Sequence, residues 1–378
     1  MESRAPAEVF PPGEFLKDEL EARGWTQTDL AEIIGRGVTV VNEILSAKRG
    51  VTPDTAQALA DALGGSAQFW LNLESIYRLS LVDHDDAVSR RARLYAKAPV
   101  REMIRRHWIE DSKSVDVLER QVLDFLGIPA LDSEPQLAYA ARKSTSYTEH
   151  PTPAQTTWLC RARQLAPAAP SNSYSKKRVP ELVKELHRLT EAPENVRHVP
   201  RLLSSYGIRF LMIESLAGTK IDGAAFWFNE SPVIVVSLRY DRIDHFWHTL
   251  MHELGHIWYN DGTLLDQEIV SDKGPLVGEK PEFEQWADAF ALNALIPKDK
   301  MDDFVIRVRP MFSAMRVQNF ARTMEVHAGI VVGQLQHKHE ISYANLRKLL
   351  VPVRQIVTGT AVTDGWGSQL PVFTAGRG

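Results

Sequence analysis

The stretch His252-Glu253-Leu254-Gly255-His256 predicts a helix and a metal site together. Two histidines four residues apart on a helix lie on nearly the same face, about one turn from each other. Zinc catalysis needs three protein ligands and one open position for water. Glu253 follows the first histidine, where its carboxylate can take a proton from the attacking water. We therefore expect a zinc-dependent peptidase in which His252 and His256 bind Zn²⁺ and Glu253 is the catalytic base.

The residues around this stretch predict a domain of strands and helices over 199–352. Runs rich in β-branched and aromatic residues predict strands at 208–213, 223–228 and 233–237. A short polar turn joins the last two strands into a hairpin. Apolar residues at helical spacing predict helices over 241–259 and 282–295.

The second of these helices offers the third metal ligand. Glu284 and Asp288 are four residues apart and share a face of it. The natural assignment places Glu284 on the zinc ion. It lets Asp288 accept the free N–H of a ligand histidine, which fixes the tautomer of that histidine. Glu282 is the rival ligand; it lies nearly opposite Glu284 on the helix, so both cannot face the metal.

Other polar residues leave two questions open. His248 lies four residues before His252, and a polar position on the helix surface is a plainer interpretation of it than metal contact. A donor for the oxyanion of the tetrahedral intermediate is also needed. Four candidates fit that role, and the sequence does not choose among them: His337, His339, Tyr240 and Tyr259.

Residues 1–81 predict a compact set of short helices. Thr26 and Asp29 form a capping box at the start of a helix over 27–34. A glycine turn separates it from a second short helix over 38–45. Two short helices joined in this way are typical of a helix-turn-helix, although a plain helical bundle fits the same pattern.

Recognition helices present polar or basic side chains near their start, where they reach base edges. The candidate DNA contacts in this region are Gln27, Thr28, Arg36, Thr39, Asn42, Lys48 and Arg49. The second short helix begins Gly37-Val38-Thr39-Val40, and residues 1–81 hold seven Lys or Arg against twelve Asp or Glu. Operator DNA is the expected partner, although these last two features argue against strong base recognition.

The interval 82–198 is expected to be a mainly helical connector. Its basic stretch, Arg90 to Arg106, is more typical of a solvated face or of ion pairs than of phosphate contacts. The Ala- and Pro-rich run that starts at Leu165, with its polar continuation to Ser175, predicts an exposed linker. The Gly- and Thr-rich segment 353–378 is expected to be a loosely held C-terminal tail.

Length and composition fit a multidomain globular protein. A chain of 378 residues is too long for one ordinary core, and its 44% hydrophobic and 24% charged residues are ordinary. The net charge of -4 gives no whole-chain attraction to nucleic acid. Cys160 is the single cysteine, so a disulfide framework is excluded. The chain has no apolar run of membrane-spanning length and no signal-peptide pattern, so we expect a cytoplasmic protein without a membrane partner.

The block from about residue 202 to 350 resembles the ImmA/IrrE metallopeptidases. The matching pieces are Ile221-Asp222-Gly223-Ala224, Arg239-Tyr240-Asp241-Arg242, the histidine stretch, and Glu284-Gln285-Trp286-Ala287-Asp288-Ala289-Phe290-Ala291 running to Ile296-Pro297. The family usually has asparagine at the position of Asp288. The change produces the Glu-x-x-x-Asp arrangement of thermolysin-type peptidases. The resemblance implies a small gluzincin-like α+β fold.

Residues 10–80 resemble the HigA/VapI-type antitoxin module of the XRE family. The matching pieces are Pro12-Gly13-Glu14-Phe15-Leu16, Gln27-Thr28-Asp29-Leu30-Ala31, Val41-Asn42-Glu43-Ile44-Leu45, Arg49-Gly50-Val51-Thr52-Pro53 and Phe69-Trp70-Leu71-Asn72-Leu73. The expected fold class is therefore multidomain: an all-α helix-turn-helix domain, a helical connector and an α+β gluzincin-like metallopeptidase domain.

The two resemblances together imply a DNA-binding transcriptional regulator with a zinc metalloendopeptidase domain. It would act as a homodimer through the helix-turn-helix region and cleave a repressor or antitoxin-type protein in a stress, mobile-element or toxin–antitoxin response. The substrate would lie along the exposed strand 223–228 as an added strand. The alternative is a HigA-like antitoxin or repressor whose metal domain senses a signal or binds a toxin with little proteolysis. Self-cleavage in an interdomain joint is a third interpretation.

Overall fold

The computed structural model describes residues 9–82, 86–135, 140–143, 151–259 and 282–366. The chain divides into two compact units, Met1–Val88 and Ser89–Gly378. None of the helices in the described ranges is long and apolar enough to cross a membrane.

The N-terminal unit is built from short helices around one apolar core. These helices are α1 (Pro12–Arg23), α2 (Gln27–Ile33), α3 (Val38–Leu45), α4 (Pro53–Leu63) and α5 (Ala67–Ser80). Leu16, Leu30, Val41, Leu59 and Trp70 are buried in its centre. The predicted pair of short helices is therefore present as α2 and α3, which pack against each other.

The first of this pair begins where the sequence predicts. The Thr26 hydroxyl accepts from the backbone N–H of Asp29, and the Asp29 carboxylate accepts from the backbone N–H of Thr26 at 2.7 Å. This capping box satisfies two N–H groups that the first turn of a helix leaves without partners. The backbone N–H and the hydroxyl of Thr26 both donate to the Asp29 carboxylate, and these hydrogen bonds lower the pKa of Asp29 from its usual value.

The second unit is an α+β domain. Its α-helices are α6 (Ala87–Lys97), α7 (Val100–Arg105), α8 (Val115–Leu126), α9 (Pro153–Leu165), α10 (Val179–Leu189), α11 (Val199–Ser205), α12 (Ile243–Tyr259), α14 (Glu282–Leu295), α15 (Lys298–Val308), α16 (Ala314–Thr323), α17 (Ala328–His337) and α18 (Arg354–Thr358). Its 3₁₀ turns are η1 (Ala166–Ala168), η2 (Lys176–Arg178), η3 (Pro193–His198) and η4 (Arg347–Leu349).

A mixed sheet forms the centre of this unit. Its strands are β1 (Ala140–Lys143), β2 (Arg209–Met212), β3 (Ile221–Phe228), β4 (Ser231–Val236) and β5 (Val362–Thr363). They are ordered β1-β3-β4-β2-β5. β3 is antiparallel to β1 and β4, whereas β2 is parallel to β4 and β5. The predicted hairpin is the β3–β4 pair, which turns at Asn229 with a positive φ of 54°.

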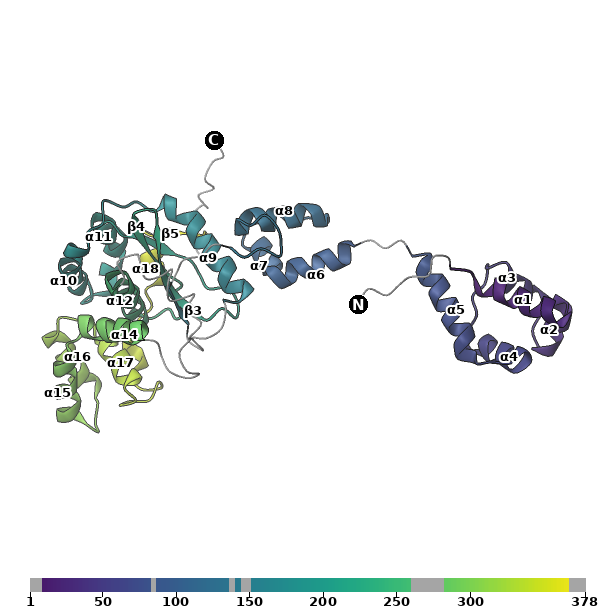
Figure 1. The fold of residues 1–378 in the computed structure, drawn as a ribbon. Helices are drawn as coiled ribbons and strands as arrows, with labels where there is room; N and C mark the ends of the chain where they lie inside the picture. The colour runs from purple at the N-terminus through teal and green to yellow at the C-terminus, as the bar shows by residue number, and fades with distance from the viewer. Residues whose placement is uncertain (1–8, 83–85, 136–139, 144–150, 260–281, 367–378) are drawn as a thin grey trace. The chain divides into compact units, whose positions relative to one another are not determined.

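Helix α12 is the central helix of the second unit. It packs against β3 and β4, and also against α14 and α17 (Figure 1). Its apolar side chains Phe246, Trp247, Leu250 and Leu254 are fully buried. Burying a side chain of this kind contributes roughly 1.5–3 kcal/mol, so α12 is held firmly in place. A site built on α12 therefore rests on a well-buried helix.

The interval 82–198 supplies part of this core. The side chains of Val179, Leu182 and Leu186 on α10 belong to the same apolar cluster as α12. Trp158 on α9 is fully buried, and its indole N–H donates to the carbonyl of Ile213 at 3.1 Å. Much of the predicted connector therefore belongs to the second unit.

Cys160 is buried on α9. Burial raises the pKa of this thiol to about 12. The thiolate is therefore scarce at neutral pH, as is typical of a buried structural thiol.

The predicted exposed linker after α9 is wrong. Ala166 and Ala169 are buried, and the Arg209 guanidinium donates to the carbonyls of both. The backbone N–H of Asn172 also donates to the carbonyl of Ser204 at 2.9 Å. Alanine and proline are common in linkers, but their small side chains also allow close packing. In this segment they pack against the rest of the domain.

The prediction of a loosely held tail over 353–378 is also wrong for the residues that the structure describes. Asp241 accepts from the backbone N–H groups of Val353 and Arg354, both at 2.8 Å. Val357 is fully buried, and β5 adds to the sheet beside β2. The segment has a polar, Gly- and Thr-rich composition, and the few residues that make these buried contacts do not stand out in it. Residues 367–378 lie outside the described residues.

Candidate functional site

Two small residues bring α14 close to α12 at the predicted metal site. A Cβ at Gly255 would lie 3.3 Å from the Cα of Ala287 and 2.9 Å from the ring of Phe290. Glycine on one helix and alanine on the other thus permit a close crossing. The crossing carries Glu284, one turn before Ala287 on α14, to the histidines of α12.

The side chains of His252, His256 and Glu284 converge. One ligand atom from each lies within 4.8 Å of the other two. The two Nε2 atoms are 3.0 Å apart, and the Glu284 carboxylate lies 3.2 Å from His252 Nε2 and 3.7 Å from His256 Nε2. All three side chains are buried, with at most 5% of any residue exposed.

This arrangement fits a tetrahedral zinc ion. Ligands about 2.1 Å from zinc in tetrahedral geometry are separated by roughly 3.4 Å. The three measured separations, 3.0, 3.2 and 3.7 Å, lie on either side of that value. Two imidazoles and one carboxylate are also a donor set that catalytic zinc takes, with a fourth position left for water.

Asp288 contacts the other side of the His252 ring. Its Oδ1 lies 2.8 Å from His252 Nδ1. A carboxylate at this distance favours a proton on Nδ1, which leaves the lone pair on Nε2, on the side of the cluster. The contact would thus orient His252 as a metal ligand.

Glu253 lies between α12 and the sheet. It is fully buried, and a Cβ at Gly223 on β3 would lie 2.7 Å from its Oε1. In the sequence, Gly223 stands out only by its place in a matching motif. In the structure a larger residue there would displace the carboxylate beside the candidate metal ligands.

The alternative residues lie elsewhere. Glu282, the rival ligand, is exposed and outside the cluster, whereas Glu284 is buried in it. His248 is half-buried, and its ring centroid lies 6.2 Å from that of His252 and 6.4 Å from that of His337. All four oxyanion candidates are exposed: His337, His339, Tyr240 and Tyr259. The ring of Tyr240 is tilted against that of His245, and the ring of Tyr259 against that of Trp286.

The expected place of the substrate strand is occupied. β3 pairs with β4 on one side and with β1 on the other, so Ala141 stands opposite Ala224. The prediction that β3 is an exposed edge is therefore wrong for Ile221–Ala225, the part of the strand that pairs with β1. β1 has no strand signal in the sequence, because its four residues, Ala140–Lys143, lack the β-branched and aromatic side chains that predict strands.

The helix-turn-helix exposes all the predicted DNA contacts. The exposed side chains are Gln27, Thr28, Arg36, Thr39, Asn42, Lys48 and Arg49. Thr39 and Asn42 lie three residues apart on one face of α3. Arg49 pairs with Glu43 at 3.0 Å, which reduces the positive charge that this end of α3 offers to phosphate.

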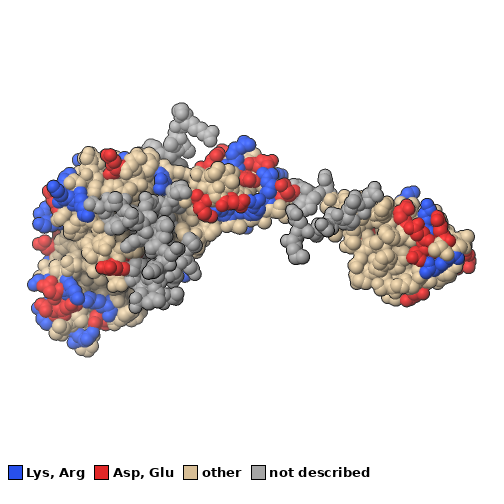
Figure 2. Space-filling view, viewed as in Figure 1, with Lys and Arg blue, Asp and Glu red and all other residues tan. Residues whose placement is uncertain are grey.

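The basic stretch after residue 89 is paired with acidic side chains. Arg90 contacts Asp116 and Glu119, both at 2.7 Å, and Arg93 contacts Asp132. On the face that Figure 2 shows, Lys and Arg lie among Asp and Glu over α6–α8. The interpretation as ion pairs is therefore the better one, and phosphate binding gains no support here.

Two family models match the chain. The helix-turn-helix model matches residues 16–70. The model of peptidase family M78, described as an IrrE N-terminal-like domain, matches residues 204–331. These matches confirm the predicted fold class, a helical helix-turn-helix region followed by an α+β domain.

Two curated relatives are similar to the N-terminal unit. Virulence-associated protein I of Dichelobacter nodosus is 39% identical over 75 residues, which cover 20% of this chain and 69% of the relative. The uncharacterized HTH-type transcriptional regulator YddM of Escherichia coli (strain K12) is 28% identical over 83 residues, which cover 22% and 88%.

Solved structures match the same region. An addiction module antidote protein of the HigA family from Coxiella burnetii is 34% identical, with a TM-score of 0.19, and the match covers 19% of this chain and 79% of that one. A Pseudomonas aeruginosa protein solved with its operator DNA is 36% identical, with a TM-score of 0.19 and coverage of 20% and 81%. The family matches and the curated relatives together place the chain among the helix-turn-helix transcription regulators of the VapI antitoxin type that also carry an IrrE-like peptidase domain of family M78.

Proposed function

We propose that the second unit is a zinc-dependent endopeptidase whose activity the helix-turn-helix unit directs to a regulatory target. The observation that carries the proposal is the buried cluster of His252, His256 and Glu284 beside the carboxylate of Glu253. A structural zinc site would use four protein ligands, whereas this one offers three and a neighbouring base. That combination is typical of hydrolysis.

Each residue has a separate task in this proposal. His252, His256 and Glu284 would hold zinc, which supplies Lewis acidity and makes a water molecule more acidic. Glu253 takes the proton from the attacking water and returns it to the leaving amine. Asp288 keeps His252 in the tautomer that binds metal. The donor to the oxyanion stays open among His337, His339, Tyr240 and Tyr259.

The target in this proposal is a repressor or antitoxin-type protein. The support is the union in one chain of a peptidase domain with a helix-turn-helix of the kind found in transcription regulators. An enzyme held at an operator meets the proteins that bind there at high local concentration. Cutting one of them would change transcription directly.

A second candidate function is an antitoxin-like repressor that cuts little. The pairing of β1 with β3 favours it, because the strand beside Glu253 is already covered by the chain itself. In this case the metal domain would sense a signal or bind a toxin. Cleavage assays separate the two candidates.

A homodimer through the N-terminal unit belongs to the proposal. Ile76, Leu79, Leu81 and Val82 are between 46% and 69% exposed at the end of α5 and just after it. Apolar side chains grouped in this way mark interaction surfaces. Light scattering should give a dimer for the wild type and a monomer for Leu79→Glu; a dimer in both would exclude this surface.

The decisive comparison is Glu253→Gln with Glu282→Gln as the matched control. Each zinc-loaded protein is incubated with peptides from a digested bacterial proteome, and new termini are identified by mass spectrometry. Removing a general base costs about 10²–10⁴ in rate, so Glu253→Gln should lose cleavage while its zinc content stays unchanged. The exposed Glu282 should tolerate the change. Equal cleavage by Glu253→Gln would eliminate the peptidase mechanism.

A further inference from the structure

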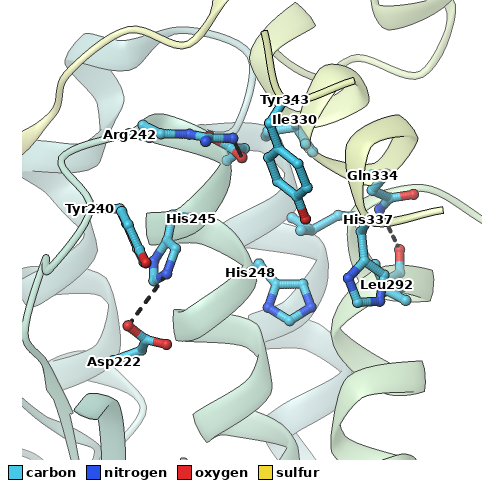
Figure 3. Close-up of a pocket in the computed structure, with 13 residues that line it drawn as sticks. Asp222, Tyr240, Arg242, His245, His248, Leu292, Ile330, Gln334, His337 and Tyr343 are labelled. Carbon is cyan, nitrogen blue, oxygen red and sulfur yellow. Dashed lines mark hydrogen bonds and ion pairs between the residues drawn. The ribbon is translucent and has the colours of Figure 1, made fainter. Parts of the chain in front are cut away.

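A cavity of about 400 Å³ lies beside the metal cluster, between the first half of α12 and α17 (Figure 3). Its wall includes His248, which is one turn before the ligand His252 on α12. The ring centroids of these two histidines are 6.2 Å apart. The cavity is therefore within one side chain's length of the place where a scissile bond would lie.

A close crossing of α12 and α17 shapes the cavity. A Cβ at Gly333 would lie 2.4 Å from a carboxylate oxygen of Asp244, so only glycine permits this approach. Leu295 and Ile330 are each 1% exposed and form an apolar floor. Pockets of this size with an apolar floor and a few polar groups are typical of ligand sites.

Both carboxylates that line the cavity have basic partners. Asp222 lies 3.5 Å from His245 Nε2 and 3.6 Å from Arg239. Arg242 donates to both oxygens of Asp244, at 3.0 and 2.6 Å. A lysine or arginine entering the cavity would have to compete with these pairs, so the lining disfavours a cationic occupant.

The other polar groups of the cavity each carry an N–H or O–H that can donate a hydrogen bond. His248, His337 and the phenol of Tyr343 lie around one part of it, and in Figure 3 the Tyr343 ring points into the space above the two histidines. The rings of His248 and His337 are 6.4 Å apart, a separation that one carboxylate can bridge. Imidazole and phenol donors suit an anionic acceptor.

We propose that this cavity is a specificity subsite that takes an acidic side chain of the substrate, next to the bond that is cut. The inference rests on the proposed peptidase function. It adds a substrate class, peptides with Asp or Glu at that position, and it assigns His337 and Tyr343 to recognition. His337 therefore binds substrate and leaves the oxyanion to another donor.

The first test uses cleavage by the zinc-loaded full chain. Proteome-derived peptides give the preferred residue at each position around the cut, and a matched pair of peptides with Glu or Gln at the selected position gives a ratio of kcat/KM. We expect a preference for Glu of about tenfold, the effect of one good hydrogen bond to a charged group. Tyr343→Phe should reduce the ratio toward one, whereas Tyr95→Phe, an exposed tyrosine on α6, should keep it.

The second test needs no turnover. A fluorescein-labelled peptide with Glu at the selected position, or Asp-rich if no cut is found, is titrated into zinc-loaded Glu253→Gln protein and followed by anisotropy. Its Gln or Asn counterpart is the control. Tighter binding of the acidic peptide, weakened by His337→Leu and by Tyr343→Phe, supports the subsite even if no peptide is cut.

The outcomes separate the two claims. Cleavage that depends on Glu253 but shows no acidic preference contradicts the subsite and leaves the peptidase intact. No cleavage, with acidic peptides still preferred in the binding assay, contradicts the peptidase and supports the subsite. Equal binding of acidic and neutral peptides, or a preference unchanged in both variants, overturns the subsite.

Discussion

Asp288 and Glu284 lie one turn apart on α14 and contact opposite nitrogens of one imidazole. The Glu284 carboxylate is 3.2 Å from His252 Nε2, and that of Asp288 is 2.8 Å from Nδ1. This division follows from helix geometry, because residues four apart share a face but differ by about 6 Å in height. The ring of His252 fits between them.

The contact between His252 Nδ1 and the Asp288 carboxylate predicts a measurable effect on metal affinity. Asp288→Ala removes the acceptor and should weaken zinc binding by about 10–100-fold, the range found for such supporting contacts. Asp288→Asn keeps an acceptor oxygen and should lose much less. Competition with a chromophoric chelator measures both affinities. Equal affinities for wild type and Asp288→Ala would remove Asp288 from the site.

His327 connects pH to the position of α17. Its Nδ1 accepts from the backbone N–H of Gly329 at 3.1 Å and caps the helix. Burial lowers the pKa of His327 below its usual 6.5, so the neutral form is favoured in the folded state. This contribution to stability is present above pH 6.5 and is lost as the pH falls through the lowered pKa.

The prediction follows from His327→Asn, which retains a capping oxygen but does not titrate. The free energy of unfolding in urea should fall between pH 8 and pH 5 by more in the wild type than in His327→Asn. The expected difference is about 1 kcal/mol, the usual contribution of a helix cap. Both proteins share every other titrating group, so the difference isolates His327. Identical losses would contradict the role of His327.

At the scale of elements, the sequence predicted those that are long or strongly patterned. Helices α12 and α14 and the β3–β4 hairpin carry clear apolar periodicity, and α2 carries a capping box. β1, β5 and η1 were not predicted because they have two to four residues each. Such short segments have no periodicity to detect, and they form because tertiary contacts hold them.

The spacing of the histidines and the glutamate is enough to predict that they lie together. The cavity beside them could not be predicted from the sequence. His252, Glu253 and His256 lie within one turn, so a helix fixes their arrangement. The cavity joins Asp222 on β3 to residues of α12 and α17, which are far apart in sequence. Only the fold places them together.

Helix α3 carries the prediction about DNA. Asn42 is exposed on the same face as Thr39, so it should contact a base edge. Asn42→Ala should weaken binding to the fragment that the wild type selects from random DNA, by about 1–3 kcal/mol. Gln57→Ala on α4 is the exposed control and should leave affinity unchanged. An equal effect of both changes on anisotropy titrations would contradict recognition through α3.

At the scale of the whole molecule, metal binding should stabilise one unit and not the other. Within the described residues, the cluster that could hold an ion lies in the second unit. A ligand that binds only the folded state adds about 2.7 kcal/mol when its free concentration is 100 times its Kd. Calorimetry with zinc and then with chelator should move the transition of the second unit alone. A matching shift in a separately expressed 1–88 fragment would contradict this assignment.

Metal analysis of two glutamate variants decides whether His252, His256 and Glu284 form a zinc site. Glu284→Ala removes a buried ligand, and Glu282→Ala removes an exposed carboxylate two residues earlier on α14. After dialysis against a weak chelator, we expect about one zinc ion per chain in the wild type and in Glu282→Ala. Glu284→Ala should retain little or none. Full zinc in Glu284→Ala, or loss of zinc in Glu282→Ala, would contradict this zinc site.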